Sequence, residues 1–283
     1  MRALRNSPHS ARRALASGTG GHHRFLTPIP MTTLIRRLLF FSCAAGLGIA
    51  SAQADPAILA KARAFVGTEA DLNAVKALRF VGELTVSDNE NPASADAASA
   101  KVEISFQKPD RQRITASNGT REETTALDGY DAWQRVSDTS DSAPWEVTLL
   151  GPEQIKRLRA NTFENLAFYR DIERVGGRVE DRGAATVDGI ACRKLAFVHG
   201  PGIVFTRSFE IATGRLVLTE TESGTAIREE GEIKAGGLRF PQRIITTNAL
   251  PDGSTRTIHV IFSSVEVNPV IDASIFPVPS LHD

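Results

Sequence analysis

The sequence predicts a mainly β protein of the α+β class, with one large antiparallel sheet and a few helices packed against it. Two observations carry this prediction. Most of the chain after residue 77 consists of runs in which apolar and polar residues alternate, as in strands with one buried face. Gly-containing turns separate these runs, as they do in hairpins. The 283 residues are 41% hydrophobic and 23% charged, which is the composition of a globular protein rather than a disordered or fibrous one.

The first 54 residues have the features of an export signal preceded by an extension. They contain seven Arg and no Lys, Asp or Glu. After Met31, the pair Arg36–Arg37 is followed by the uncharged run Leu38–Ala50 and then by small residues, which is the order of a secretory signal. The predicted segments are a spurious or disordered extension at 1–30, a signal peptide at 31–54 that is cleaved after Ala54, and a single domain at 55–283.

The charge and cysteine content of the predicted domain exclude some classes of function. Residues 55–283 hold 26 basic and 33 acidic side chains, a net charge of −7. We expect no nucleic-acid partner, because such a domain lacks the required basic face. Cys192 is the domain's one cysteine, so no internal disulfide can form. Its expected role is that of a small buried apolar residue.

Two short helices are expected before the first strand. Ile58, Ala62 and Phe65 recur with helical spacing, and Gly67 ends that pattern. A second helix is expected to begin at Thr68, because Thr-x-x-acid is a common form of helix start.

Eleven strands follow from the alternation of apolar and polar residues. They are Leu78–Val86, Lys101–Gln107, Arg111–Ser117, Thr124–Leu127, Ala132–Val136, Cys192–Val198, Ile203–Ile211, Leu216–Glu222, Ala226–Ile233, Phe240–Thr247 and Thr255–Val267.

One helical insertion is expected between the fifth and sixth of these strands. Gly151–Pro152 opens it, and Ile155 and Leu158 share one face of the helix. A break is expected near Asn161–Thr162, after which the apolar pattern continues to Ala167.

The sequence contains no recognisable catalytic or metal-binding motif. It has no H-E-x-x-H, no G-x-S-x-G, no phosphate-binding loop and no G-x-G-x-x-G after a strand. The histidines that remain after the predicted cleavage, His199, His259 and His282, are expected in the core or on the surface. The prediction is therefore a protein that is not an enzyme and has no cofactor or metal.

Four stretches of the chain resemble a known superfamily. They are the paired helices at 58–78, the D-G-x-x-x-W pattern within Leu127–Trp133, the hairpin turns at Asp188–Gly189, Thr213–Gly214 and Gly237–Pro241, and the N-x-x-I-D-x-x-x-F-x-x-P ending within Val267–Pro279. In this order and spacing they are similar to the periplasmic lipoprotein-carrier superfamily. That superfamily comprises the LolA/LolB-like and outer-membrane lipoprotein-sorting proteins, with relatives in sigma-factor regulation.

The resemblance implies an unclosed antiparallel β-barrel of about ten or eleven strands, with helices covering its concave face. It implies a periplasmic, monomeric, non-catalytic carrier that binds acyl chains of lipids or lipoproteins for transfer towards the outer membrane, with an envelope membrane protein as a further partner. An alternative is a regulatory module of the same fold that senses lipid and binds a protein. A periplasmic hydrolase is the third interpretation.

The residues expected to line a hydrophobic ligand site are Trp133, Phe106, Phe205, Phe209, Ile155 and Leu158. Lys108, which precedes Pro109, is the nearest match to the basic residue that Lol carriers have before a proline, although the family has arginine there. It is the candidate for polar hand-off of the cargo.

The helical insertion is the expected lid. Burying an acyl chain of about sixteen carbons gains on the order of 12 kcal/mol at about 0.8 kcal/mol per methylene, so release needs a competitor for the same apolar surface. We expect the helix at Pro152–Ala160 to pack on the sheet when the site is empty and to be displaced by ligand.

Overall fold

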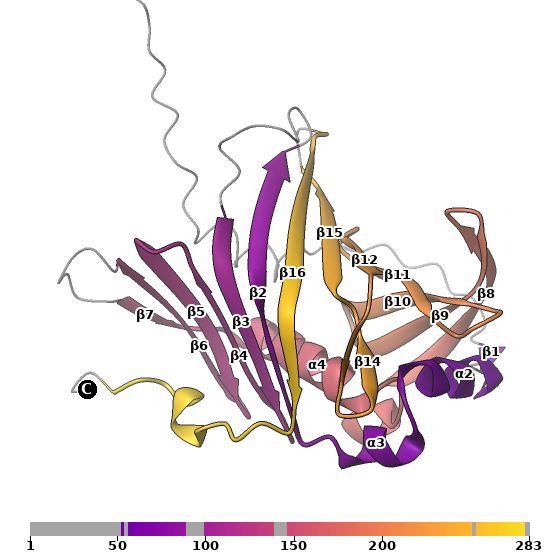
Figure 1. Cartoon of the computed structure of the whole chain (residues 1–283), viewed down its shortest axis with the longest axis horizontal. Helices are drawn as coiled ribbons and strands as arrows, with labels where there is room; N and C mark the ends of the chain where they lie inside the picture. The colour runs from indigo at the N-terminus through magenta and orange to yellow at the C-terminus, as the bar shows by residue number, and fades with distance from the viewer. Residues whose placement is uncertain (1–51, 54–55, 89–98, 139–145, 251–252, 281–283) are drawn as a thin grey trace, which may run out of the picture. The chain divides into compact units, whose positions relative to one another are not determined.

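One antiparallel sheet of fourteen strands forms the body of the fold, and its two edges, β1 and β7, are not joined to each other (Figure 1). The computed structural model describes residues 52–53, 56–88, 99–138, 146–250 and 253–280, which all lie in one compact unit. This architecture confirms the predicted unclosed antiparallel barrel with helices. Apart from residues 52–53, the predicted extension and signal peptide, with its cleavage site at Ala54, lie outside the described residues.

The sheet has the strand order β1-β8-β9-β10-β11-β12-β15-β16-β2-β3-β4-β5-β6-β7, and a second sheet pairs β13 with β14. The strands are β1 (Ala52–Gln53), β2 (Ala77–Asp88), β3 (Ser99–Gln107), β4 (Arg111–Ser117), β5 (Arg121–Asp128), β6 (Asp131–Asp138), β7 (Glu146–Leu149), β8 (Arg178–Val187), β9 (Ile190–Gly200), β10 (Ile203–Glu210), β11 (Leu216–Thr221), β12 (Ala226–Glu230), β13 (Ile233–Ala235), β14 (Leu238–Phe240), β15 (Arg243–Ala249) and β16 (Thr255–Val267). The helices are α2 (Pro56–Val66), α3 (Glu69–Ala74) and α4 (Pro152–Ala167), with 3-10 turns η1 (Ile172–Val175) and η2 (Ala273–Ile275).

The described residues contain more strands than the eleven that the alternation predicts. The pattern misses β1, β7 and β8, and it includes only the last residue of β14, Phe240, as the start of the predicted strand Phe240–Thr247. A register shift between Asp181 and Ala184 interrupts the alternation of β8, and β7 has only four residues. The predicted strand Ala226–Ile233 divides into β12 and β13, because Gly231 adopts a φ of 67° and turns the chain.

Helix α4 is continuous, so the predicted break near Asn161–Thr162 is wrong. Both side chains find an acceptor outside the helix. The amide of Asn161 and the hydroxyl of Thr162 donate to Oε1 of Gln112 on β4, at 2.9 and 3.1 Å. Since these groups are satisfied by the sheet, they do not compete for the helical backbone.

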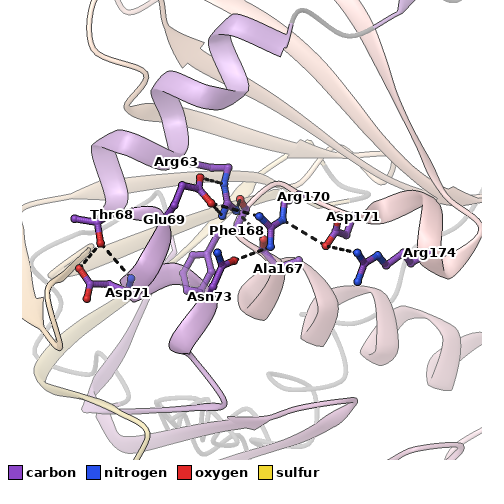
Figure 2. A network of polar contacts seen from close by, with 10 residues as sticks. All are labelled: Arg63, Thr68, Glu69, Asp71, Asn73, Ala167, Phe168, Arg170, Asp171 and Arg174. Atoms are coloured by element: carbon purple, nitrogen blue, oxygen red, sulfur yellow. Dashed lines mark hydrogen bonds and ion pairs between the residues drawn. The ribbon is translucent and has the colours of Figure 1, made fainter.

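The start of α3 is as predicted. The Oγ1 of Thr68 accepts a hydrogen bond from the backbone N–H of Asp71 at 3.1 Å, which is the geometry of an N-cap (Figure 2). The helix ends at Ala74, and the chain enters β2 at Ala77.

The sheet bends around α4. This helix contacts β3, β4 and β5, and its Glu164 is hydrogen-bonded to His199 of β9. Strand β4 lies eight steps from β9 in the sheet, or about 38 Å at about 4.8 Å per step, whereas a helix is only about 10 Å across. One helix can reach both strands only if the sheet curves. We call the face that carries α4 the inner face.

Two large apolar clusters fix the helices on this inner face. One joins α3 and the end of α4 to β2, β3, β14 and β16; its buried members include Leu72, Phe80, Phe106, Leu166 and Phe262. The other joins α2 to β9, β10 and β11; its buried members include Ile58, Ala62, Leu195, Phe197 and Phe209.

Gly82 is where β2 comes closest to β16. A Cβ at this position would lie 2.3 Å from the carbonyl oxygen of Ile261, next to the register shift between Phe262 and Ser264. We predict that Gly82→Ala lowers the free energy of unfolding by about 1–3 kcal/mol, because the two backbones must separate. Chemical denaturation measures this. In the control Gly200→Ala the added Cβ meets no atom within 4 Å, and we expect a change below about 0.5 kcal/mol; equal losses in both variants would contradict the prediction.

Candidate functional site

The inner face of the sheet carries an apolar cluster, which we call the sheet cluster. Its buried members are Leu84, Val102 and Ile258, and its partly buried members are Val86, Ile104, Ile114 and Val260. They lie on β2, β3, β4 and β16. Within the described ranges, no helix contributes a side chain to it.

The sheet cluster continues the surface on which the helices pack. Side chains two residues apart on a strand share a face. Phe106 of β3 packs in the same cluster as Leu166 of α4, so Ile104 and Val102 point the same way as Phe106. The helices therefore cover one end of a long apolar face, and the sheet cluster is its other end.

Helix α4 is held to both walls of the bent sheet by polar contacts. Its buried side chains lie on two opposite sides of the helix, with Leu158, Thr162 and Leu166 on one side and Ala160 and Glu164 on the other. Thr162 faces β4 through Gln112, and Glu164 faces β9 and β10.

The contact between α4 and β9–β10 is a buried charge cluster. The Glu164 carboxylate is 2.6 Å from Nε2 of His199 and also accepts from Nη1 of Arg207. Burial alone would raise the pKa of Glu164, but Arg207 and His199 together hold it below its usual value. The Arg207 guanidinium also lies 4.8 Å from the ring centre of Phe197 and 5.1 Å from that of Tyr169. The cluster fixes α4 through charge and aromatic contacts together.

The N-terminal half of α4 is held by two arginines that point to opposite walls. Arg157 donates to the carbonyl of Gly202 at 2.6 Å and forms an ion pair with Glu222. Arg159 forms a 2.6 Å ion pair with Asp110 and lies 4.0 Å over the ring of Tyr130. The side chains of Arg157 and Arg159 remain partly exposed, at 21% and 28%.

The C-terminal end of α4 is tied to the first two helices (Figure 2). Arg63 of α2 donates to the carbonyl oxygens of Ala167 and Phe168 at 3.2 and 2.7 Å. It also makes two 2.6 Å hydrogen bonds to Glu69 of α3, and Arg170 approaches the same carboxylate. A guanidinium at a helix C-terminus satisfies carbonyls that have no helical partner. This end of α4 is the more firmly fixed one.

The six predicted ligand-lining residues lie in different environments. Phe106, Phe209 and Leu158 are 4%, 0% and 0% exposed and pack in three separate clusters around the helices. Phe205 is partly buried beside Phe209's cluster, and Ile155 is partly buried beside Leu158. The structure thus gathers these five on the inner face, around α4, as side chains of the core.

Trp133 lies on the other face. Its neighbour Ala132 packs with Leu158 of α4, so the Trp133 side chain points away from the helix. The indole N–H donates to the carbonyl of Phe276 in the C-terminal segment at 2.8 Å. The structure does not bring Trp133 together with the other five residues.

Lys108 lies in the turn between β3 and β4, with its side chain exposed. Its backbone N–H donates to the carbonyl of Lys76 at 2.9 Å. Partial burial and the nearby Arg170 lower the pKa of Lys108. A role in hand-off stays a prediction.

Sequence reasoning missed the residues that hold α4 to the β9–β10 wall. One signal was available: Arg207 falls between Phe205 and Phe209 on the apolar side of β10, and a charge on such a face needs a partner. Nothing in the local pattern identifies Glu164 as that partner.

The described part of the chain has no group of three His, Cys, Asp or Glu residues that could hold a metal ion. Among the described helices, none is long and apolar enough to cross a membrane.

Comparison with known proteins returned solved structures only. No family model and no curated protein match the sequence. A DUF1329 family protein from Desulfovibrio piger is 11% identical with a TM-score of 0.49, over 80% of this chain and 98% of its own. A LolA superfamily protein from Nitrosomonas europaea is 14% identical with a TM-score of 0.49, over 81% and 99%. A putative outer membrane lipoprotein-sorting protein domain from Vibrio parahaemolyticus is 9% identical with a TM-score of 0.49, over 77% and 95%. Identities this low concern the fold alone.

Two carboxyl groups of the inner face, those of the buried Glu123 and the half-buried Glu229, predict a pH dependence of stability. Burial raises the pKa of Glu123 to about 7 against the opposing effect of Arg121, and burial raises the pKa of Glu229 to about 7 against that of Arg207. Both are usually near 4.5. Between these values the folded protein holds protons that the unfolded chain releases, so unfolding becomes easier as the pH rises from about 5 to about 8.

We predict that the melting temperature falls over this pH range and that Glu123→Gln and Glu229→Gln each flatten the fall. Circular dichroism at a series of pH values measures it. Glu122→Gln is the control, because Glu122 lies on the opposite face of β5 and pairs with Arg135. An unchanged slope in both glutamine variants would contradict the assignment.

Proposed function

We propose that this protein is a non-catalytic carrier that binds the acyl chains of lipids or lipoproteins on the inner face of the sheet and delivers them towards the outer membrane. The observation that carries the proposal is the sheet cluster, an apolar surface that continues the helix-packing face and receives no side chain from a described helix. Such a surface, bordered by a few polar groups, is the usual form of a site for a hydrophobic ligand.

Helix α4 is proposed as the lid of this site. It occupies the inner face next to the sheet cluster, where an acyl chain would compete with it for apolar surface. Its N-terminal half is held by the partly exposed Arg157 and Arg159 and by the packing of Leu158 on Leu127 and Ala132, whereas its C-terminal end is bonded to the buried Arg63. Opening would therefore begin at Pro152 and pivot near Ala167. When α4 returns to the inner face, its packing offsets the large free energy of acyl burial, and the ligand can be released.

Two neighbouring substitutions on β16 test the proposed acyl site. Val260 belongs to the sheet cluster, whereas Ile261 is 43% exposed and points to the opposite face. We expect Val260→Glu to lower the affinity for a fluorescent monoacylglycerol by at least about tenfold, because the carboxylate loses hydration beside an acyl chain. Ile261→Glu should change it by less than about twofold.

Native mass spectrometry of the protein purified from the cell envelope checks the same pair without an added probe. Wild type and Ile261→Glu should carry acyl lipid, and Val260→Glu should carry less. Lipid-free protein with a bound protein partner, in all three cases, would replace the carrier proposal with the regulatory one.

A cross-link between α4 and the sheet tests whether α4 acts as a lid. In Arg157→Cys/Glu222→Cys, a short bis-maleimide linker with a reducible bond would join α4 to the end of β11, where the native side chains form an ion pair. Cys192 is 0% exposed and should not react. We expect the linked protein to take up the fluorescent monoacylglycerol at least about tenfold more slowly, and reduction of the linker to restore the rate. Equal rates before and after reduction would show that α4 does not need to move.

A further inference from the structure

A group of buried polar side chains on the inner face has atoms without a hydrogen-bond partner. The two carboxylate oxygens of Glu123, the hydroxyl of Thr125 and the amide nitrogen of Gln134 lack a hydrogen bond. These residues are 0%, 1% and 7% exposed. The nearest charge is Arg121, whose Nε is 3.5 Å from Glu123 without a hydrogen bond between them. Buried polar groups without partners are uncommon, because each loses its hydration without compensation.

These side chains lie together at one end of the sheet cluster. Thr125 is directly opposite Ile114 on β4 and Gln134 on β6. Glu123 is opposite Ala116, which is opposite Val102 of the sheet cluster. Residues in register across neighbouring strands share a face and lie about 5 Å apart. The polar group, on β5 and β6, therefore borders the sheet cluster at Ile114 of the neighbouring strand β4.

The position relative to α4 is also defined. The helix covers the row of Gln112, Leu127 and Ala132, as its contacts with Gln112 and its packing on Leu127 show. Thr125 and Gln134 form the next row along the strands, and Glu123 the row after that. The polar group thus lies beyond the row that the proposed lid covers.

We propose that Glu123, Thr125 and Gln134 form a subsite for the polar head of the acyl ligand, and that this head is uncharged and carries hydroxyl or amide groups. This inference rests on the proposed function and names the class of its ligand. The subsite offers donors from Thr125 and Gln134 and an acceptor from Glu123, which match a head group that both accepts and donates hydrogen bonds.

The charges of the subsite explain the preference for a neutral head. Arg121 already offsets the charge of Glu123. A hydroxyl or amide head leaves this pair balanced, whereas a carboxylate or phosphate head would add a negative charge beside Glu123 in a buried site. The ligand class is therefore a neutral acylated molecule, such as an acylglycerol or an acyl amide, rather than a free fatty acid.

The test compares two ligands with the same acyl chain. Monopalmitoylglycerol and palmitate compete for the fluorescent monoacylglycerol bound to the mature chain at about pH 8, where Glu123 is largely ionised because its pKa is about 7. We expect wild type to prefer monopalmitoylglycerol by about tenfold or more. Glu123→Gln should remove most of that preference by strengthening palmitate binding. Thr125→Val should lower the affinity for monopalmitoylglycerol by about fivefold or more and leave the affinity for palmitate nearly unchanged.

Two controls keep the result interpretable. Glu122→Gln and Thr124→Val make the same changes on the opposite face of β5 and should keep the wild-type preference. Glu123→Gln removes an unpartnered buried carboxylate, so it should fold at least as well as wild type at this pH. If Glu123→Gln keeps the wild-type preference for monopalmitoylglycerol, the subsite is overturned and the carrier proposal is not affected. If wild type binds neither ligand, both the subsite and the carrier proposal are overturned.

Discussion

The structure depends on one constraint: a long antiparallel sheet with an apolar face must cover that face. Fourteen strands in linear order leave β1 and β7 as separate edges, so closure does not remove the problem. The chain instead bends the sheet and places α2, α3 and α4 on its inner face. The described helices pack on one part of that face, and the sheet cluster, with its buried Leu84, Val102 and Ile258, lies on another part. The ligand site that we propose is thus a consequence of how the sheet is covered.

The contacts that hold α4 differ from those that hold an ordinary core helix. It buries Thr162 and Glu164 along with its leucines, and its partners are the polar Gln112, His199 and Arg207. A buried charge with hydrogen-bonded partners favours one specific position more than it favours overall stability. Such a helix has a defined position on the inner face, which Leu158 and Leu166 also hold through apolar packing.

The inner face also distributes its polar groups unevenly. On the β9–β10 side Arg207 and His199 are both hydrogen-bonded to Glu164, although the Nε of Arg207 has no hydrogen bond. On the β5–β6 side neither carboxylate oxygen of Glu123 has a hydrogen bond. The first group, Glu164 with His199 and Arg207, holds α4 on the inner face. The second has no structural use that we can identify within the described residues, and this difference is why we assign it to the ligand.

The class of fold, the start of α3 at Thr68 and the strand Thr255–Val267 are predictable from the amino-acid sequence, because turn residues, capping and alternation are local properties. The sequence also indicated the helix that lies on the inner face. Only the tertiary structure decided that α4 continues through Asn161, that Trp133 points away from it, and that Glu164 meets Arg207. Each of these depends on which distant residue lies opposite. Alternation tells which side chains share a face of one strand, but the bend of the sheet decides what that face meets.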